Sequence, residues 1–339
     1  MKHTIPLIAG LLGVVSWTLC ANAQQVPPTP PVSPAVAPVS PAVASSLPAP
    51  PMSAELRNLI APGAAVEKVA GGFEFTEGPV WHPSGRLYFS DLRGNKTYTW
   101  NPKEGVVRHP GPGNKSNGLA FDPQGRLVFC EHGGRKLSRL EKDEQFVTVV
   151  DRYQGKRLNA PNDLAIAPDG SIYFTDIRRN LPRGEEPEIE FSGVYRLRPN
   201  GELQLIDDEM DVPNGIAFSP DRKQLYVADT RGQQVWAFDV GADGSPVEKR
   251  LFAETNPTWD YPAALSRPDG LKTDVEGNVY VGVVETGVWV FDKNGRHLGV
   301  IPVPEQTTNV AFGDADARTL YITANTGLYR IRLVNCGSK

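Results

Sequence analysis

Six short segments of the sequence begin with a side chain that carries oxygen and can bind a cation. Each segment is an apolar strand, a polar turn and a second apolar strand. We call their first residues the openers: Glu77, Asn117, Asn162, Asn214, Asp269 and Asn309. Two openers are charged, and no Lys, Arg or apolar residue interrupts the set. Hard divalent cations prefer carboxylate and amide oxygens, so the openers predict a metal site if the fold brings them together.

Calcium is the cation that this set favours, because Ca²⁺ accepts six to eight oxygen ligands in flexible geometry. The sequence has no Cys/His cluster of the kind that zinc prefers, although Mg²⁺, Mn²⁺ or Zn²⁺ can replace calcium in an open site. The competing interpretation is that Asn and Asp at strand starts only hydrogen-bond their own backbone. Recurrence in all six segments, including a Glu, favours the metal.

The spacing of the openers predicts the fold that must position them. Successive openers lie 40, 45, 52, 55 and 40 residues apart. Weaker strands follow each hairpin, as at 96–101 and 106–110 in the first repeat, which gives four strands per repeat. Six such repeats predict an all-β protein, a six-bladed β-propeller with four-stranded antiparallel blades. One blade cannot bury both faces of its sheet, so neighbouring blades must stack around an axis.

The two ends of the repeat region predict how the ring closes. The last repeat has only three strands, which end in the segment 327–334. The segment 66–73 precedes the first repeat, and we predict that it supplies the outer strand of the last blade. Because antiparallel strands return to where they began, all openers should meet at one mouth of the axial channel. The carboxylates that end four of the hairpins should bind backbone N–H groups or Arg within the blades: Asp91, Glu131, Asp176 and Asp229.

Five motifs resemble the gluconolactonase/senescence-marker-protein (regucalcin) family over about residues 66–334. The motifs are EGPVW, NGLAFDPQGRLVFCEHGGRKLSRLE, PNDLAIAPDGSIYFTD, VPNGIAFSPD and RPDGLKTDVEGNVYV. The resemblance implies that Glu77, Asn214 and Asp269 hold one divalent metal on the channel axis, with Asn162 near both metal and substrate. Animal members carry an Arg two residues before that Asn, where this chain has Ala160. Their substrate contacts are therefore not expected to be copied closely.

The resemblance and the oxygen set together predict a calcium-dependent sugar lactonase that acts on gluconolactone-type aldonolactones. A bound cation can polarise a lactone carbonyl and lower the pKa of a bound water. We predict metal binding by Glu77, Asn162, Asn214 and Asp269, with Asp269 as the base for water and Glu77 holding the metal. Asn117 and Asn162 would orient the substrate.

His132, in an EHG sequence that recurs in bacterial members of the resembled family, is predicted to contact substrate or shuttle a proton. The alternative is a solvated loop histidine.

Two further functions stay open from the sequence. One is hydrolysis of other lactones or of phosphotriesters on the same scaffold. The other is a non-catalytic propeller that binds a protein or sugar, with Ca²⁺ in a structural role. The sequence contains no Gly-x-Ser-x-Gly motif and no glycine-rich phosphate loop, so neither an acyl-enzyme nor a nucleotide cofactor is expected.

The chain ends and its composition predict the domain organisation and the partners. Residues 1–23 have the pattern of a signal peptide with cleavage near Ala23, residues 24–52 form a Pro/Ala-rich disordered linker, and residues 53–339 form a single propeller domain. The protein is therefore expected to be exported, periplasmic or secreted, without membrane insertion. The net charge is −4, or about −5 after removal of Lys2, and argues against nucleic acid as a partner. A small-molecule sugar lactone and a monomer or weak dimer are expected.

Two long irregular segments are predicted at the mouth that carries the openers. The first, 177–192, contains Arg178, Arg179 and Arg183, and the second, 254–268, contains Trp259, Asp260, Tyr261 and Arg267. Long loops at one end of a rigid scaffold commonly handle ligands.

Overall fold

The computed structural model describes residues 52–255 and 266–338. The predicted signal peptide 1–23 and all but the last residue of the linker 24–52 lie outside these residues, as do Trp259, Asp260 and Tyr261 of the second long segment. The proposed domain boundaries therefore remain predictions. Among the described residues, no helix has the length and apolar character needed to cross a membrane.

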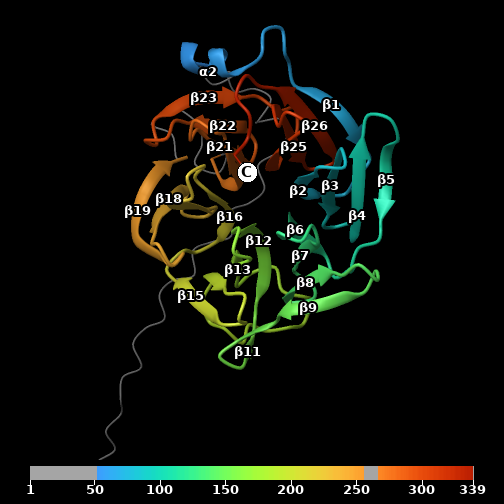
Figure 1. The fold of residues 1–339 in the computed structure, drawn as a ribbon, viewed down its shortest axis with the longest axis vertical. Helices are drawn as coiled ribbons and strands as arrows, with labels where there is room; N and C mark the ends of the chain where they lie inside the picture. Colours follow the sequence, from blue (N-terminus) through green and yellow to red (C-terminus); the bar gives the residue numbers. More distant parts are fainter. Residues whose placement is uncertain (1–51, 256–265, 339) are drawn as a thin grey trace, which may run out of the picture. The chain divides into compact units, whose positions relative to one another are not determined.

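Six antiparallel sheets of four strands each stand around a common centre (Figure 1). The innermost strand of each sheet contacts the innermost strands of its two neighbours, which closes the ring. The sequence-based prediction of a six-bladed propeller is therefore confirmed.

The first three blades follow the chain from the inside outward. Blade one contains β2 (Thr76–His82), β3 (Arg86–Asp91), β4 (Lys96–Asn101) and β5 (Gly105–His109). Blade two contains β6 (Ser116–Phe121), β7 (Leu127–Glu131), β8 (Lys136–Leu140) and β9 (Phe146–Val150). A small hairpin, β10 (Arg152–Tyr153) and β11 (Lys156–Arg157), precedes the next blade and was not predicted. Blade three contains β12 (Ala160–Ile166), β13 (Ile172–Ile177), β14 (Gly193–Leu197) and β15 (Leu203–Asp207).

The remaining blades repeat this order, except that the last takes its outer strand from the N-terminal side of the ring. Blade four contains β16 (Pro213–Phe218), β17 (Gln224–Asp229), β18 (Gln234–Val240) and β19 (Pro246–Glu254). Blade five contains β20 (Pro268–Thr273), β21 (Val279–Val283), β22 (Gly287–Phe291) and β23 (His297–Ile301). Blade six contains β24 (Thr307–Gly313), β25 (Thr319–Ala324), β26 (Gly327–Arg332) and β1 (Glu67–Gly71).

The ring closes as the sequence predicted. Strand β1 pairs antiparallel with β26 and completes blade six. Across the junction of blades six and one, the ring of Trp81 stacks on that of Tyr321, with centroids 5.4 Å apart. Helix α2 (Ala54–Leu59) begins after Ser53, whose Oγ accepts the backbone N–H of Leu56 (3.0 Å). Leu56 is fully buried among residues of blades five and six, so the chain before β1 is also fixed to the ring.

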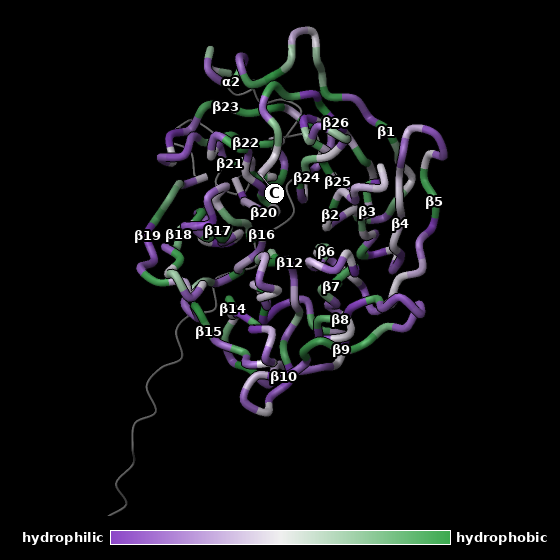
Figure 2. Tube along the Cα trace, viewed as in Figure 1, coloured by the Kyte–Doolittle hydropathy of each residue, from purple (hydrophilic) through white to green (hydrophobic). Residues whose placement is uncertain are grey.

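The hydrophobic core is divided among the junctions between blades. Buried apolar side chains form six clusters among the described residues, and each cluster combines residues of two adjacent sheets. Figure 2 shows hydrophobic stretches along the strands of every blade. Because each sheet is covered on both faces by its neighbours, stability comes mainly from packing between blades and leaves the channel free for polar residues.

The innermost strands are not regular, and this differs from the plain hairpins expected from the sequence. In every blade the register between the first and second strands shifts at or beside the opener. In blade four, for example, Asn214 and Gly215 lie between the pairs Pro213–Asp229 and Ile216–Val227, opposite the single residue Ala228. Such a β-bulge leaves residues unpaired and re-aims their side chains.

Glycine follows several openers because the next blade comes very close. A Cβ on Gly215 would lie 2.3 Å from the carbonyl oxygen of Asp269, which is closer than real Cβ contacts allow. The opener of blade five is thus held directly against the bulge of blade four.

The carboxylates at the ends of the second strands fix the chain at the same end of the blades. Asp91 accepts the backbone N–H groups of Phe75 (2.9 Å) and Gly94 (3.1 Å), which lie on either side of its hairpin. Asp229 accepts Val212 N and Gly232 N in the same way, each at 3.1 Å. Asp176 accepts Asn159 N (2.8 Å), and Glu131 accepts the Asn114 amide (2.9 Å). The prediction that these carboxylates bind backbone N–H groups is confirmed for Asp91, Asp176 and Asp229. Glu131 instead accepts hydrogen bonds from the side chains of Asn114 and Ser138.

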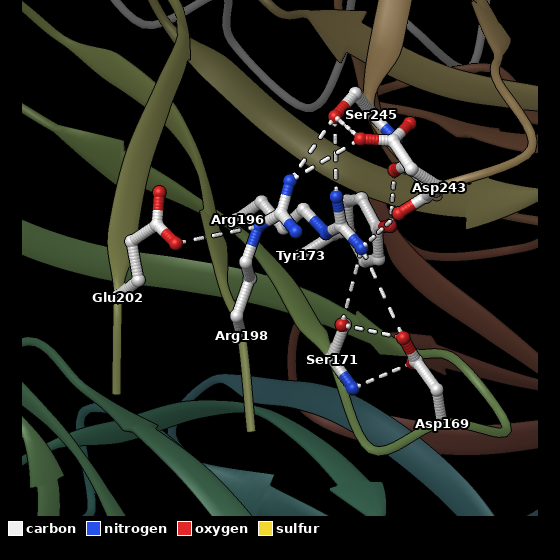
Figure 3. A network of polar contacts seen from close by, with 9 residues as sticks. Asp169, Ser171, Tyr173, Arg196, Arg198, Glu202, Asp243 and Ser245 are labelled. Atoms are coloured by element: carbon white, nitrogen blue, oxygen red, sulfur yellow. Dashed lines mark hydrogen bonds and ion pairs between the residues drawn. The ribbon is translucent and has the colours of Figure 1, made fainter. Parts of the chain in front are cut away.

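A buried arginine of β14 joins blade three to the β18–β19 turn of blade four (Figure 3). The Arg196 guanidinium donates to the carbonyl oxygen of Asp243 (2.6 Å) and lies over the ring of Tyr173, 5.5 Å from its centroid. The Tyr173 hydroxyl donates to the carbonyl of Gly244 (2.5 Å) in the same turn. The β18–β19 turn is thereby locked onto the preceding blade.

Asp176 gives the fold a testable pH dependence. It is fully buried, and burial raises the pKa of its carboxyl to about 7 although the N–H groups of Asn159 and Ala160 oppose the shift. An unfolded Asp has a pKa of about 3.9, so folding takes up a proton. The contribution of this group to the free energy of unfolding is therefore largest at low pH and falls as pH rises from about 4 to about 7.

We predict that Asp176→Asn loses less stability than the wild type between pH 5 and pH 8. Asparagine keeps an acceptor for Asn159 N but has no proton to lose. As pH rises over this range, the free energy of unfolding of the wild type should therefore fall by about 1–3 kcal/mol more than that of the variant. Urea unfolding at several pH values, with chelator present, measures the difference. Asp316→Asn is the control, because Arg332 holds the pKa of Asp316 at about 2, outside this window. Parallel pH curves for wild type and Asp176→Asn would contradict the prediction.

Candidate functional site

All six openers are buried at the start of the innermost strands. Their exposed fractions are 3% for Glu77, 3% for Asn117, 5% for Asn162, 7% for Asn214, 8% for Asp269 and 2% for Asn309. The strands that carry them lie innermost in the ring: β2, β6, β12, β16, β20 and β24 (Figure 2). The bulges described above place these side chains at the channel.

Two opener carboxylates are buried and act on one another electrostatically. Burial raises the pKa of Glu77 well above its ordinary value, and the nearby charge of Asp269 raises it further. Burial and then the charge of Asp163 raise the pKa of Asp269, while Asn214 and Arg267 oppose the shift. The neighbouring amide and guanidinium groups do not fully compensate the negative charge of these two carboxylates. A cation added to the site would therefore be favoured.

Asp163 is a site residue that the sequence analysis missed. It occupies the bulge beside Asn162, where blades two, four and five have Gly118, Gly215 and Gly270. Its carboxylate reaches across the channel: Asn309 Nδ2 of blade six donates to Oδ2 (3.2 Å), and Lys272 Nζ of blade five lies 3.9 Å away. The available signal was the Asn-Asp pair of the third repeat, where neighbouring repeats have Asn-Gly or Asp-Gly.

Two buried oxygens at the site lack partners. Among the described residues, Asn214 Oδ1 and Asp269 Oδ1 are buried and accept no hydrogen bond. The orientation of the Asn214 amide is fixed, because its Nδ2 donates to Thr230 Oγ1 (3.0 Å). A buried acceptor without a partner costs free energy, and an oxygen-preferring cation would satisfy both. The residues present therefore fit a divalent cation.

The donor set is mixed rather than purely acidic. Within residues 52–255 and 266–338, no group of three His, Cys, Asp or Glu residues has an arrangement that could hold a metal. Amide oxygens of Asn must therefore complete any cation site at the openers. Such a set suits Ca²⁺ better than zinc.

His132 lies behind an opener instead of in solvent. It follows β7 and is only 3% exposed. Asn117 Nδ2 donates to its Nε2 (3.1 Å), and burial followed by the nearby Lys115 charge lowers the pKa of the imidazole to about 4. The ring is thus neutral at neutral pH, with its proton on Nδ1. The alternative of a solvated loop histidine is wrong, and the contact assigns His132 to orienting Asn117.

Ion pairs connect the long segment 177–192 to neighbouring parts of the ring. Arg135, buried in the turn that also contains His132, donates to Glu185 (2.9 Å), and Arg157 of the β10–β11 hairpin donates to the same carboxylate (3.2 Å). Of the predicted ligand-handling arginines, Arg178 pairs with Glu190 (2.9 Å) and Arg179 with Asp211 (3.2 Å). The Arg135 pair connects the segment to blade two, and the Arg179 pair connects it to the residues just before β16. The Arg178 pair lies within the segment itself.

Arg267 is the cation nearest to the opener of blade five in sequence, two residues before Asp269. Its Nε is buried and has no hydrogen-bond partner among the described residues. Its charge lowers the pKa of Asp269 and that of Glu285, so the guanidinium lies close to both.

The C-terminal tail lies at the other end of β20. Ser338 N donates to the carbonyl of Thr273 (2.9 Å), the last residue of β20, and the two hydroxyls are 2.6 Å apart. Gly337 touches Phe312 of β24 so closely that a Cβ there would clash at 2.2 Å. The tail therefore contacts β20 and β24 at the end away from their openers.

Comparison with known proteins relates this chain to a family of lactonases. Residues 75–326 match the family model described as the SMP-30/Gluconolactonase/LRE-like region. A gluconolactonase of Zymomonas mobilis is 32% identical over 298 residues, which are 80% of this chain and 82% of that protein. A pentonolactonase of Haloferax volcanii is 27% identical over 74% of this chain and 81% of its own length. The solved structure of a gluconolactonase of Xanthomonas campestris is 36% identical, with a TM-score of 0.75, and covers 84% of this chain and 95% of that one.

The protonation of His132 can be tested directly. We predict that its imidazole titrates near pH 4 in the folded protein, well below the ordinary 6.5, with Nε2 unprotonated. Nitrogen-15 NMR of histidine-labelled protein measures both the midpoint and the tautomer. In the Asn117→Ala variant the nitrogen-15 chemical shift of His132 Nε2 should change, because Nε2 no longer accepts a hydrogen bond from Asn117. A midpoint near 6.5 in the wild type would mean that the ring is solvated.

Proposed function

This chain belongs to the SMP-30/gluconolactonase/LRE-like family, and we propose that it hydrolyses a sugar lactone with the help of a divalent cation, first of all Ca²⁺. Relatives that cover most of the chain are gluconolactonases and a pentonolactonase, so the chain is a lactonase. The observation that supports the metal dependence is a pair of buried oxygens near Glu77, Asn214 Oδ1 and Asp269 Oδ1, which have no hydrogen-bond partner among the residues that the structure describes. Gluconolactone-type aldonolactones are the substrates that we propose.

Four openers would hold the cation: Glu77, Asn162, Asn214 and Asp269. When bound, the cation supplies Lewis acidity, which polarises the lactone carbonyl and lowers the pKa of a water molecule. Mg²⁺, Mn²⁺ and Zn²⁺ are alternatives that the same oxygens can bind.

The residues of the chain supply proton transfer and orientation. Asp269 is our candidate for the general base, because its buried environment favours accepting the proton from the attacking water. Glu77 balances the charge of the cation. Asn117 and Asn162 can donate their amide N–H groups to substrate hydroxyls, or to the carbonyl oxygen as negative charge develops on it. His132 keeps the Asn117 amide in the orientation that this role needs.

Contacts with the rest of the sugar must come from the opener end. Ala160 offers no charge there, whereas the charge of Arg267 acts on Asp269 and its Nε has no hydrogen-bond partner within residues 52–255 and 266–338. We propose that Arg267 binds a substrate oxygen. We also propose that the protein is exported, on the pattern of residues 1–23.

The activity is tested by acid release from D-glucono-1,5-lactone. Removing all metal with a chelator should abolish enzymatic turnover, and Ca²⁺ should restore it. Unchanged rates in the metal-free protein would discard the metal-dependent mechanism. Metal binding without turnover of any sugar lactone would instead support the binding-module alternative.

Single substitutions separate the two opener carboxylates. Asp269→Asn removes the proposed base and should lower kcat by about 10²–10⁴-fold. Glu77→Gln removes a charged ligand, so its loss of activity should be partly recovered at high Ca²⁺. Neither change should abolish folding, because packing between blades stabilises the ring; thermal unfolding checks this. Asp221→Asn, in an exposed turn of blade four, is the control and should behave like the wild type. Wild-type kcat in Asp269→Asn would exclude it as the base.

A further inference from the structure

In the innermost strands of blades two to five, two residues are charged where the corresponding residues of the other blades are glycine or alanine. Asp163 stands in a bulge position where blades two, four and five have glycine. Lys272 pairs with Tyr280 in β21, the register position that holds Ala120, Ala165 and Ala217 in blades two, three and four. In blades two to five, the first of these positions is glycine except for Asp163, and the second is alanine except for Lys272.

The two departures meet in the channel. Lys272 Nζ lies 3.9 Å from Asp163 Oδ2, although the residues belong to blades five and three. The side chain of Asp163 is 3% exposed and that of Lys272 is 30% exposed. Lys272 Nζ also donates to the carbonyl of Leu271 (2.9 Å), which holds the ammonium against the innermost strand.

Asp163 is held rigidly between blades. Its Oδ1 accepts the backbone N–H of Leu164 (2.9 Å) and would lie 2.6 Å from a Cβ on Gly118. Its Oδ2 accepts the amide of Asn309 (3.2 Å). The carboxylate therefore cannot turn away from the neighbouring opener carboxylates Glu77 and Asp269. The charge of Asp163 acts on the carboxyls of both Glu77 and Asp269, so a third carboxylate contributes to the field at the proposed cation site.

We propose that the Asp163–Lys272 pair sets the affinity of the site for a divalent cation. The Asp163 carboxylate strengthens binding as a charge outside the ligand set, and the Lys272 ammonium limits it by repulsion. This inference rests on the cation site of the proposed function. Lys272 is a positioning charge here and takes no part in the reaction itself.

A purely structural role of the pair predicts a different result. If the ion pair only held blades three and five together, removing either partner would loosen the site and weaken cation binding. If the pair sets the local charge, the two removals must act in opposite directions.

Calorimetric titration of Ca²⁺ into the full chain, stripped of metal by chelator, tests this. Asp163→Asn should weaken binding by about 10–100-fold, as is usual for groups just outside a metal's ligands. Lys272→Met should tighten binding by about tenfold through loss of charge repulsion. Lys272→Arg keeps the charge, so its Ca²⁺ affinity should stay near that of the wild type. The affinity of the double variant, Asp163→Asn with Lys272→Met, should lie between those of the two single variants.

Lys249→Met is the matched control. Lys249 is a half-buried lysine on the outer strand β19, paired with Asp207 (2.5 Å), and its removal changes the net charge equally. It should leave Ca²⁺ affinity unchanged. Thermal unfolding of each variant verifies the fold, and if Asp163→Asn does not fold, the comparison of Lys272→Met with Lys272→Arg decides.

The outcomes separate the two proposals. Opposite shifts for Asp163→Asn and Lys272→Met support the inference. Weaker binding in both, or unchanged binding in both, overturns it while leaving metal-dependent hydrolysis intact. A wild type that binds neither Ca²⁺ nor Mg²⁺, Mn²⁺ or Zn²⁺ would overturn this inference together with the metal part of the proposed function.

Discussion

The burial of three neighbouring carboxylates in one channel is the constraint on which the rest of the structure depends. Glu77, Asp163 and Asp269 are each less than a tenth exposed, and the charges of Asp163 and Asp269 act on their neighbours. Ionised groups buried together cost several kcal/mol unless positive charge or hydrogen bonds compensate. Lys272 and Arg267 supply part of that compensation. Asn214 Oδ1 and Asp269 Oδ1 have no hydrogen-bond partner in the part of the chain that the structure describes, and a cation would supply more. This imbalance of charge is the basis of the metal-assisted hydrolysis that we propose.

Packing between the blades stabilises the fold despite the uncompensated negative charge in the channel. Apolar side chains pack between blades, in six clusters among the described residues, so the channel itself need not contribute a hydrophobic core. Bulges at the openers turn polar side chains out of the sheets, and the carboxylates that end the second strands fix the adjoining loops. The fold therefore separates the parts that stabilise the ring from the residues that handle a ligand, which is typical of repeat architectures.

Repeat spacing and turn chemistry were sufficient to predict the six blades, the closing strand at 66–73 and the position of the openers at the start of the first strand of each blade. These features are periodic or local, and sequence patterns report them directly. The bulges could not be predicted, because a shift of one residue leaves the apolar pattern of the strand nearly unchanged. For the same reason Asp163 was passed over as the neighbour of Asn162. Its contacts with Asn309 and Lys272 join residues more than 100 positions apart, and spacing carries no information on them. The burial of His132 was likewise hidden, since its loop position suggested solvent.

The most direct test of this account is the anomalous scattering of a crystal grown with Mn²⁺ in place of Ca²⁺, because manganese gives a strong signal at an accessible wavelength. The account predicts one peak in the channel, bonded to oxygens of Glu77, Asn214 and Asp269, with Asn162 beside it. No peak there, or a peak held by other residues while these side chains stay apart from it, would contradict the claim that the openers form a cation site.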